Sequence, residues 1–304
     1  MDGLILVDKP RNYTSHDIIL KLRKILKTGK IGHFGTLDPL ATGLLAVAVG
    51  KATKLFPFFS KADKYYEGKI RLGYATDTYD AEGKPIAPEK KKLPEENEVL
   101  KAMKKFEGET TQLPPPFSAK KFRGKPLYKL ARNNRNTPLT PSRINVYFFR
   151  MKDYRPPFLD FEVKCSSGTY IRSLSHDLGQ VLGCGAHLTK LRRLEIGSFH
   201  LREAHTLEEI EKWIEEEKFE NLLIPVEVLL THLPKIILKE SGSRLARNGN
   251  LIYPENILKV LIEDTPPGKE KEELFRLFSE EGRLLALARK GKEENSLHPF
   301  LVMS

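Results

Sequence analysis

The sequence has little cysteine and lacks long apolar runs, and both shortages narrow what the chain can be. Its 304 residues include two cysteines, Cys165 and Cys184, too few for a disulfide framework and at a spacing that fits no zinc motif. Nor do two histidines stand one helical turn apart near a third ligand, so we predict no metal site. The longest apolar runs, such as Leu44–Val49, are far too short to span a bilayer.

Targeting signals, internal repeats and low-complexity tracts are also missing. The N-terminus lacks the basic segment and following apolar run of a signal peptide, which predicts a cytoplasmic location. Hydrophobic residues make up 40% and charged residues 30%, a balance typical of globular chains and not of disordered ones. The length suits one large domain and one small domain.

Positive charge is in excess, with 51 Lys and Arg against 40 Asp and Glu, for a net charge of +11. Such an excess favours a polyanionic partner such as nucleic acid. The alternative is the abundance of solvated Lys and Glu found in many thermophile proteins. The basic residues cluster in residues 51–64, 120–135 and 190–193, which favours the nucleic-acid interpretation.

Apolar periodicity predicts a chain that mixes strands and helices. Strands are expected at residues 3–7, 44–49 and 65–74, and at about 144–151 and 159–165. The first helix is expected to begin after Thr14-Ser15 and to end near Gly29. Further helices are expected at residues 99–106, 169–181 and 208–217, the second of these with Ile171, Leu174, Leu178 and Val181 facing the core.

Two segments differ from this pattern. Residues 113–143 hold three consecutive prolines and many Lys and Arg, which predicts a protruding basic insertion. From residue 232 onward, short strands at 235–238, 274–278 and 284–288 alternate with Gly and Pro turns, as in a small barrel. We therefore predict two domains, 1–231 and 232–304.

The most informative segment is Gly-His-Phe-Gly-Thr-Leu-Asp-Pro-Leu-Ala-Thr-Gly at residues 32–43. Pro39 forces Asp38 away from helical backbone angles, so Asp38 lies on a glycine-rich loop between apolar segments. Asp-Pro in such a setting is usually only a turn. A loop shaped in this way is also where scaffolds present reactive side chains.

Three further motifs follow the loop in order. They are Lys64-Tyr65-Tyr66-Glu67, Gly168-Thr169-Tyr170-Ile171-Arg172, and Leu191-Arg192-Arg193 with Gly197 and Phe199 behind it. Together with the loop they resemble the TruB family of pseudouridine synthases, which isomerise uridine 55 in the T-arm of transfer RNA. The resemblance covers residues 1–230 well, and the remainder is weakly similar to a PUA domain, an RNA-binding module.

The resemblance implies an α+β fold with a mixed, largely antiparallel central sheet flanked by helices, the pseudouridine synthase fold, followed by a small PUA-like barrel. It implies no cofactor, because an isomerisation has no net redox change. The implied partner is the T-arm of tRNA, bound without a guide RNA, a protein partner or a membrane. No sustained heptad and no long exposed edge predicts a dimer, so we expect a monomer.

The resemblance also assigns chemistry to three side chains. Asp38 would be the nucleophile, since carboxylate adducts form reversibly. Tyr66 would stack on the flipped base, and its phenol would be able to relay the C5 proton. Arg172 would pair with Asp38 and fix its rotamer. The residues alone leave Arg172 free to pair instead with Asp177 or to lie on the surface.

Other residues would hold the RNA. By the resemblance, His33 positions the rearranged T-loop and Leu191 gives the pocket an apolar wall. The remaining substrate-binding candidates are Tyr170, Lys121, Arg132 and Arg192.

The roles or orientations of four further side chains near these motifs follow from their residue types and positions. Arg192 and Arg193 suit phosphate contacts or scaffold ion pairs, and Arg193 suits a solvated position nearly as well. Phe34 either stacks on substrate or packs in the core. Tyr65 should face away from Tyr66, because neighbouring residues of a strand alternate.

Two other functions remain open to the sequence. One is the catalytic subunit of a guide-RNA-dependent pseudouridine synthase. The basic insertion argues against it, since recognising RNA unaided needs more protein surface. The other is a non-catalytic factor that binds or folds tRNA.

Overall fold

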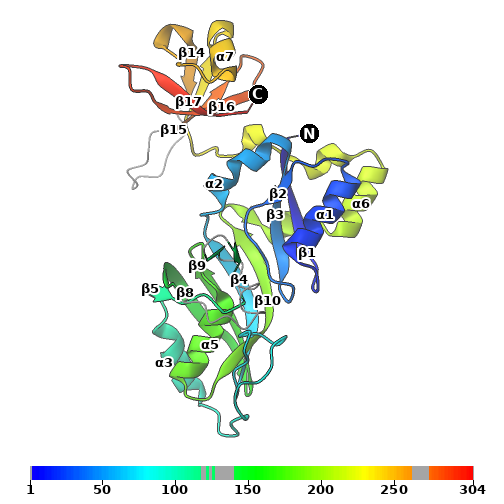
Figure 1. Cartoon of the computed structure of the whole chain (residues 1–304), viewed down its shortest axis with the longest axis vertical. Helices are drawn as coiled ribbons and strands as arrows, with labels where there is room; N and C mark the ends of the chain where they lie inside the picture. The colour runs from blue at the N-terminus through cyan, green and yellow to red at the C-terminus, as the bar shows by residue number, and fades with distance from the viewer. Residues whose placement is uncertain (1, 118–120, 123–124, 127–139, 262–273, 304) are drawn as a thin grey trace.

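The computed structural model describes residues 2–117, 121–122, 125–126, 140–261 and 274–303. Its described strands form a ten-stranded sheet, a five-stranded sheet towards the C-terminus and a two-stranded hairpin (Figure 1). Within the described residues, no helix is both long and apolar enough to cross a membrane.

The large sheet has the strand order β12-β1-β3-β10-β4-β9-β8-β5, with β2 paired to β3 and β11 paired to β10. Only the pairing of β3 with β10 is parallel, so the expected mixed, largely antiparallel sheet is confirmed. The strands span β1 Gly3–Lys9, β2 Ile31–His33, β3 Thr42–Val49, β4 Lys64–Leu72, β5 Gly108–Gln112, β8 Ser142–Arg155, β9 Phe158–Cys165, β10 Ala186–Ile196, β11 Phe199–His200 and β12 Ile224–Pro225.

Strand β10 joins the two halves of this sheet and was not predicted. It runs between β3 and β4, so that Arg193 lies beside Gly43 on one side and beside Tyr66 on the other. The sequence hid it because the charged Arg193 occupies an inward position and so breaks the alternation of apolar and polar residues. The loop and the tyrosine strand therefore meet across one central strand.

Helices cover the sheet in two groups (Figure 1). Helices α1 (Ser15–Ile25) and α6 (Leu207–Glu215) pack their apolar residues against β1 and β3. Helices α3 (Glu96–Lys104) and α5 (Ile171–Val181) cover the half made by β4, β8, β9 and β10. The remaining short helices are α2 Phe56–Phe59, η1 Gly50–Leu55, η2 Leu201–Glu203, η3 Phe219–Leu222, η4 Val226–Val228 and η5 Pro254–Asn256.

Two helix predictions need correction. Helix α1 begins after Thr14, whose side chain shares a capping box with Asp17, but it ends at Ile25 and not near Gly29. On α5, Ile171, Leu174 and Leu178 are buried as expected, whereas Val181 is 51% exposed. In the same last turn Leu178 and Gly179 stay buried, so Val181 lies on the solvent side of the helix.

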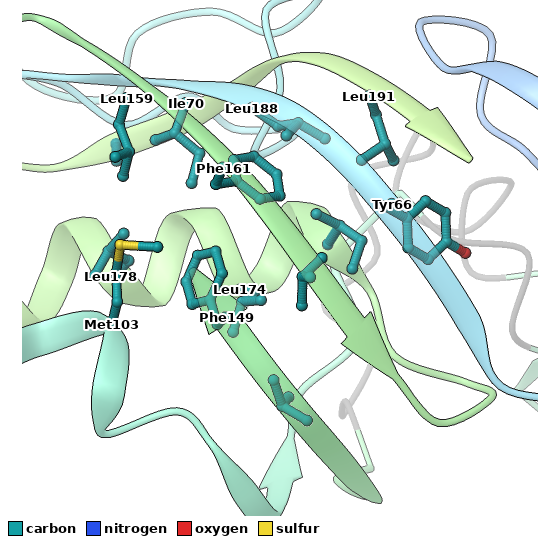
Figure 2. Close-up of a cluster of buried hydrophobic side chains, with 14 of the residues drawn as sticks. Tyr66, Ile70, Met103, Phe149, Leu159, Phe161, Leu174, Leu178, Leu188 and Leu191 are labelled. Carbon is teal, nitrogen blue, oxygen red and sulfur yellow. The ribbon is translucent and has the colours of Figure 1, made fainter. Parts of the chain in front are cut away.

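The apolar core of the half made by β4, β8, β9 and β10 extends to Tyr66 and Leu191, two of the predicted site residues. Figure 2 shows Tyr66 and Leu191 at one end of the cluster of buried side chains that also holds Ile70 and Phe161. Even-numbered residues of β4 face this cluster, and Tyr65 points to the other face, where its hydroxyl donates to Glu162. The site is thus built on the edge of a packed core.

The C-terminal sheet has the order β14-β13-β15-β16-β17. The predicted strands are present as β13 Lys235–Leu238, β15 Leu274–Phe278 and β16 Leu284–Lys290, whereas helix α7 Glu240–Arg247 and strands β14 Ile257–Leu261 and β17 Leu297–Val302 were missed. In the part of the chain that the structure describes, no pairing joins β14 to β17, so the barrel and its likeness to a PUA domain stay predictions.

One buried contact and one exposed contact fasten this sheet to the rest of the chain. Arg276 is buried and its guanidinium donates to the carbonyls of Leu233 and Thr231 at 2.9 and 3.2 Å. The Lys54 ammonium donates to the Val302 carbonyl at 2.6 Å. The segment that connects the two sheets is therefore held by the second sheet itself.

The predicted insertion lies between β5 and β8. Its described backbone includes the short strands β6 (Lys121–Phe122) and β7 (Lys125–Pro126), which pair as a hairpin. The side chain of Lys121 and the whole of Arg132 lie outside the described residues.

Candidate active site

The loop that follows β2 holds Asp38 at the edge of the sheet. Helix α1 pins this loop, because the Leu37 amide donates to Ser15 Oγ at 2.8 Å and Ser15 Oγ donates to the Leu37 carbonyl at 3.1 Å. The Ala41 amide closes a turn on the Asp38 carbonyl at 3.0 Å. The Asp38 side chain keeps 38% of its surface exposed, so its carboxylate is fixed but reachable.

Arg193 supports the same loop from beneath. It is 1% exposed, and its guanidinium donates to the carbonyls of Leu44, Gly35 and Thr36 at 2.7, 3.0 and 3.3 Å. Gly35 has a φ of 126°, a conformation that favours glycine and turns its carbonyl towards the guanidinium. The interpretation of Arg193 as a solvated charge is therefore wrong, because strand alternation places it on the inner face.

Arg172 contacts Asp38 through two nitrogens. Its Nε lies 2.8 Å from Asp38 Oδ2, and its Nη2 donates to Asp38 Oδ1 at 3.1 Å. The Arg172 side chain is 7% exposed. Its other partners are Asp80, at 3.5 Å, and the carbonyls of Thr78 and Phe117, at 3.2 and 3.0 Å. Arg172 is thus neither a surface residue nor a partner of Asp177.

Asp80 was not singled out in the sequence. It is buried, and its carboxylate accepts from the Thr78 hydroxyl and from the Glu82 amide. The same carboxylate faces Arg172 from the side opposite Asp38. Its position among turn residues was the one signal in the sequence, and that signal is weak because aspartate is common in turns.

A cavity of about 300 Å³ brings five of the proposed residues together. Its size falls at the lower end of the range for small-molecule sites. Its walls include Asp38, Tyr66, Tyr170, Arg172 and Leu191. The hydroxyl of Tyr66 is buried, and that burial raises the pKa of the phenol above its usual value. A carboxylate, a neutral phenol and an apolar side chain therefore share one small space.

His33 lies on the other side of Asp38. It lines a second cavity of about 600 Å³ together with His16, Asp38, Asp80 and Phe117, and it is not part of the first cavity's wall. Burial, helped by the positive charge of Arg193 and by His16, lowers the pKa of His33 below its ordinary value. The imidazole is therefore neutral at pH 7.

Arg192 and Phe34 lie away from both cavities. The Arg192 guanidinium donates to the two Asp8 carboxylate oxygens at 2.6 and 3.1 Å, which makes it an ion pair of the scaffold as well as a wall residue of a separate cavity of about 660 Å³. Phe34 is buried, and its ring stacks on Phe59 with centroids 5.1 Å apart. Of its two interpretations, Phe34 therefore packs in the core.

Two lysines near the loop are buried. Lys9 was not singled out in the sequence, and Lys64 was noted only as part of the tyrosine-strand motif. Lys64 donates to the Ser60 carbonyl at 2.9 Å, and Lys9 donates to the Tyr13 carbonyl at 2.6 Å. Burial is the main reason why the pKa of each falls from 10.5 to about 8. For Lys64 a signal was present, because it stands two residues before Tyr66 and so on the same strand face.

These features together describe an α+β protein that holds a carboxylate against a buried arginine in a small, cation-lined cavity, the arrangement of a candidate active site. Two family models match the chain over adjoining residues. "TruB family pseudouridylate synthase (N terminal domain)" matches residues 23–171, and "tRNA pseudouridylate synthase B C-terminal domain" matches residues 172–231. The chain belongs to the TruB family of pseudouridine synthases.

Known proteins agree with this membership. The chain is 42% identical to the tRNA pseudouridine synthase B of Solibacter usitatus over 249 residues, 82% of this chain and 85% of that one. It is 36% identical to the enzyme of the same name from Clostridium tetani over 302 residues, 99% of this chain and all of that one. Among solved structures, that of a Cbf5-Nop10-Gar1 complex matches with a TM-score of 0.73 and 28% identity, over 99% of this chain and 85% of that one.

Proposed function

We propose that this chain converts uridine 55 of the tRNA T-loop to pseudouridine, and that it does so without a guide RNA. Pseudouridine formation in tRNA is the activity that the family and the curated relatives give to this chain. The observation that supports the mechanism best is the Arg172–Asp38 pair, which faces Tyr66 across one cavity.

The reaction breaks the bond between ribose C1′ and uracil N1, joins C1′ to C5, moves a proton off C5 and places one on N1. It is balanced without an oxidant or a reductant. Asp38 would form and release an adduct with the target nucleotide, and Arg172 would hold the carboxylate in place. Tyr66 would stack on the flipped base, while its neutral phenol stands ready to exchange the C5 proton.

The remaining residues would hold the RNA. Leu191 and Tyr170 line the cavity that would receive the flipped base, and the neutral His33 would pack against the rest of the T-loop in the second cavity. Lys121 and Arg132, from the basic insertion, would contact phosphates of the T-arm. We assign residues 1–231 to catalysis and residues 232–304 to a PUA-like RNA-binding domain.

The test is incubation of unmodified tRNA with the purified chain, followed by mapping of pseudouridine. We expect product at position 55 alone, with no guide RNA added. Asp38→Asn removes the nucleophile but keeps the size of the side chain, so it should abolish product and largely preserve tRNA binding. Normal turnover by Asp38→Asn would refute the catalytic assignment.

The same experiment separates the other functions. Product only when a guide RNA and partner proteins are added would support a guide-dependent subunit. Tight binding of tRNA with no pseudouridine under any condition would support a tRNA-folding factor. We further propose that the chain acts in the cytoplasm and that it acts as a monomer. Light scattering of the tRNA complex can check the oligomeric state.

A further inference from the structure

A pair of stacked rings lies behind Arg172 and has no role in the function proposed above. Tyr79 and His176 are nearly parallel, with an interplanar angle of 16° and ring centroids 3.8 Å apart. His176 belongs to α5, and Tyr79 belongs to the loop that follows β4. Neither residue lines the cavity that holds Asp38 and Tyr66.

Tyr79 has an unusual backbone conformation. Its φ is 65°, in the left-handed region that residues with a Cβ rarely enter. The Tyr79 carbonyl accepts from the Leu188 amide of β10 at 3.0 Å, and the Tyr79 amide approaches the Thr76 carbonyl at 3.3 Å. The backbone therefore reverses at Tyr79 while both of its peptide groups stay bonded.

This reversal has a consequence for Arg172. The residue before Tyr79 offers its carbonyl to Arg172 Nη1 at 3.2 Å, and the residue after it, Asp80, places a carboxylate oxygen 3.5 Å from the same nitrogen. The left-handed residue Tyr79 therefore lies between two acceptors that face one guanidinium, so a change in the conformation of this turn would displace both of them.

Helix α5 reaches this turn at two points. His176 follows Arg172 by four residues, so the two side chains lie on one face of the helix, one turn apart. Arg172 binds the acceptors on each side of Tyr79, and His176 stacks on the Tyr79 ring itself. The buried Nδ1 of His176 has no hydrogen-bond partner among the described residues, so stacking is the contact that orients the ring.

We propose that Tyr79 and His176 are positioning residues, whose stacking holds the turn at residues 78–80 against α5 and thereby fixes Arg172 in its contact with Asp38. The proposal rests on the proposed function, because it assumes that the Arg172–Asp38 contact matters for turnover. Without the stack the left-handed turn loses a restraint, and Arg172 gains freedom to leave Asp38.

The kinetic test uses the full chain with unmodified tRNA. His176→Ala should lower kcat about three- to tenfold, the range expected for an aromatic pair, and leave KM for tRNA unchanged. His176→Phe keeps a flat ring and should retain near wild-type kcat. Gln180→Ala, one turn further along α5 at an exposed position, is the matched control and should have no effect.

A second substitution tests whether the two rings act together. If they do, adding Tyr79→Ala to His176→Ala should cost little beyond the single change. Additive losses, a change confined to KM, or an equal loss in His176→Phe would each overturn the proposal. Should His176→Ala fail to fold, Tyr79→Ala alone removes the same stack from the loop side.

A spectroscopic readout keeps this inference separate from the proposed function. The Nε–H resonance of Arg172, assigned in ¹⁵N-labelled protein with Arg172→Lys, should shift and exchange faster with water in His176→Ala but not in Gln180→Ala. An unchanged resonance would overturn the proposal. If the wild type makes no pseudouridine, the proposed function fails, and this measurement still decides whether the stack restrains Arg172.

Discussion

Replacing Arg193 with methionine tests the inner support of the Asp38 loop. Arg193 and Arg192 are neighbours in sequence, but the first is buried against loop carbonyls and the second forms a partly exposed ion pair with Asp8. Methionine keeps most of the length of the arginine side chain and removes its charge and its hydrogen bonds. The same change at Arg192 is therefore a matched control.

The structure sets the expected size of the effect. Arg193→Met leaves the carbonyls of Leu44, Gly35 and Thr36 without their donor, at about 1–3 kcal/mol for each buried group. Part of this loss is offset, because the arginine also repels Lys9 and Lys64 and lowers the pKa of both. We expect a net destabilisation of about 3–5 kcal/mol, typical of a broken buried network.

Thermal unfolding followed by circular dichroism measures this difference. For a protein of this size about 1 kcal/mol shifts the Tm by roughly 2–4 °C, so Arg193→Met should lower it by about 10 °C. Arg192→Met should cost at most about 1 kcal/mol, the usual range for an exposed ion pair. Equal, small shifts in the two variants would contradict the view that Arg193 holds the loop.

Three further predictions concern groups near the same loop. The pKa of Lys64 is lower in the folded chain than in the unfolded chain, so protonation of Lys64 opposes folding. The free energy of unfolding should therefore rise from about pH 8 to 10.5, and it should rise less in Lys64→Met. Urea titrations at each pH measure this difference. His33 should bind its proton only below pH 6.5, and an NMR titration of its ring in Arg193→Met should give a higher pKa than in wild type. Gly43→Ala should lower the Tm by several degrees, since φ is 97° and a Cβ would lie 2.4 Å from the Arg193 carbonyl.

Local pattern was enough for the parts of the fold whose polarity alternates in a regular way. Strand β4 alternates along its length, and α1 begins at a capping box that the sequence spells out. Strand β10 could not be found in this way, because at Arg193 a charged residue occupies an inward position. An arginine is stable at that position only where carbonyl groups accept its hydrogen bonds. The accepting carbonyls belong to residues about 150 positions away in the sequence.

The same limit applies to the site: local pattern identified some of its residues, whereas others depend on contacts between distant segments. Residue types and loop chemistry made Asp38 a candidate, but Arg172 is 134 residues away, and only a resemblance between whole sequences brought the two together beforehand. Asp80 was not identified because it contributes to the site only through its contact with the Arg172 guanidinium, and that contact joins segments far apart in the sequence. Lys64 was noted in a motif but its burial was not expected, because a lysine in a strand is ordinarily solvated.

Buried Arg193 also explains why the loop has glycine at position 35. Its guanidinium donates to the carbonyls of Leu44, Gly35 and Thr36, so main-chain dipoles help to compensate its charge. A loop that turns its carbonyls inward in this way needs backbone angles that few residues adopt, and Gly35 supplies one of them. With its carbonyls bound beneath, the loop presents the Asp38 carboxylate outward, where Arg172 meets it from a different layer of the fold. The carboxylate is thus held from two sides, while 38% of its side-chain surface stays open to a substrate.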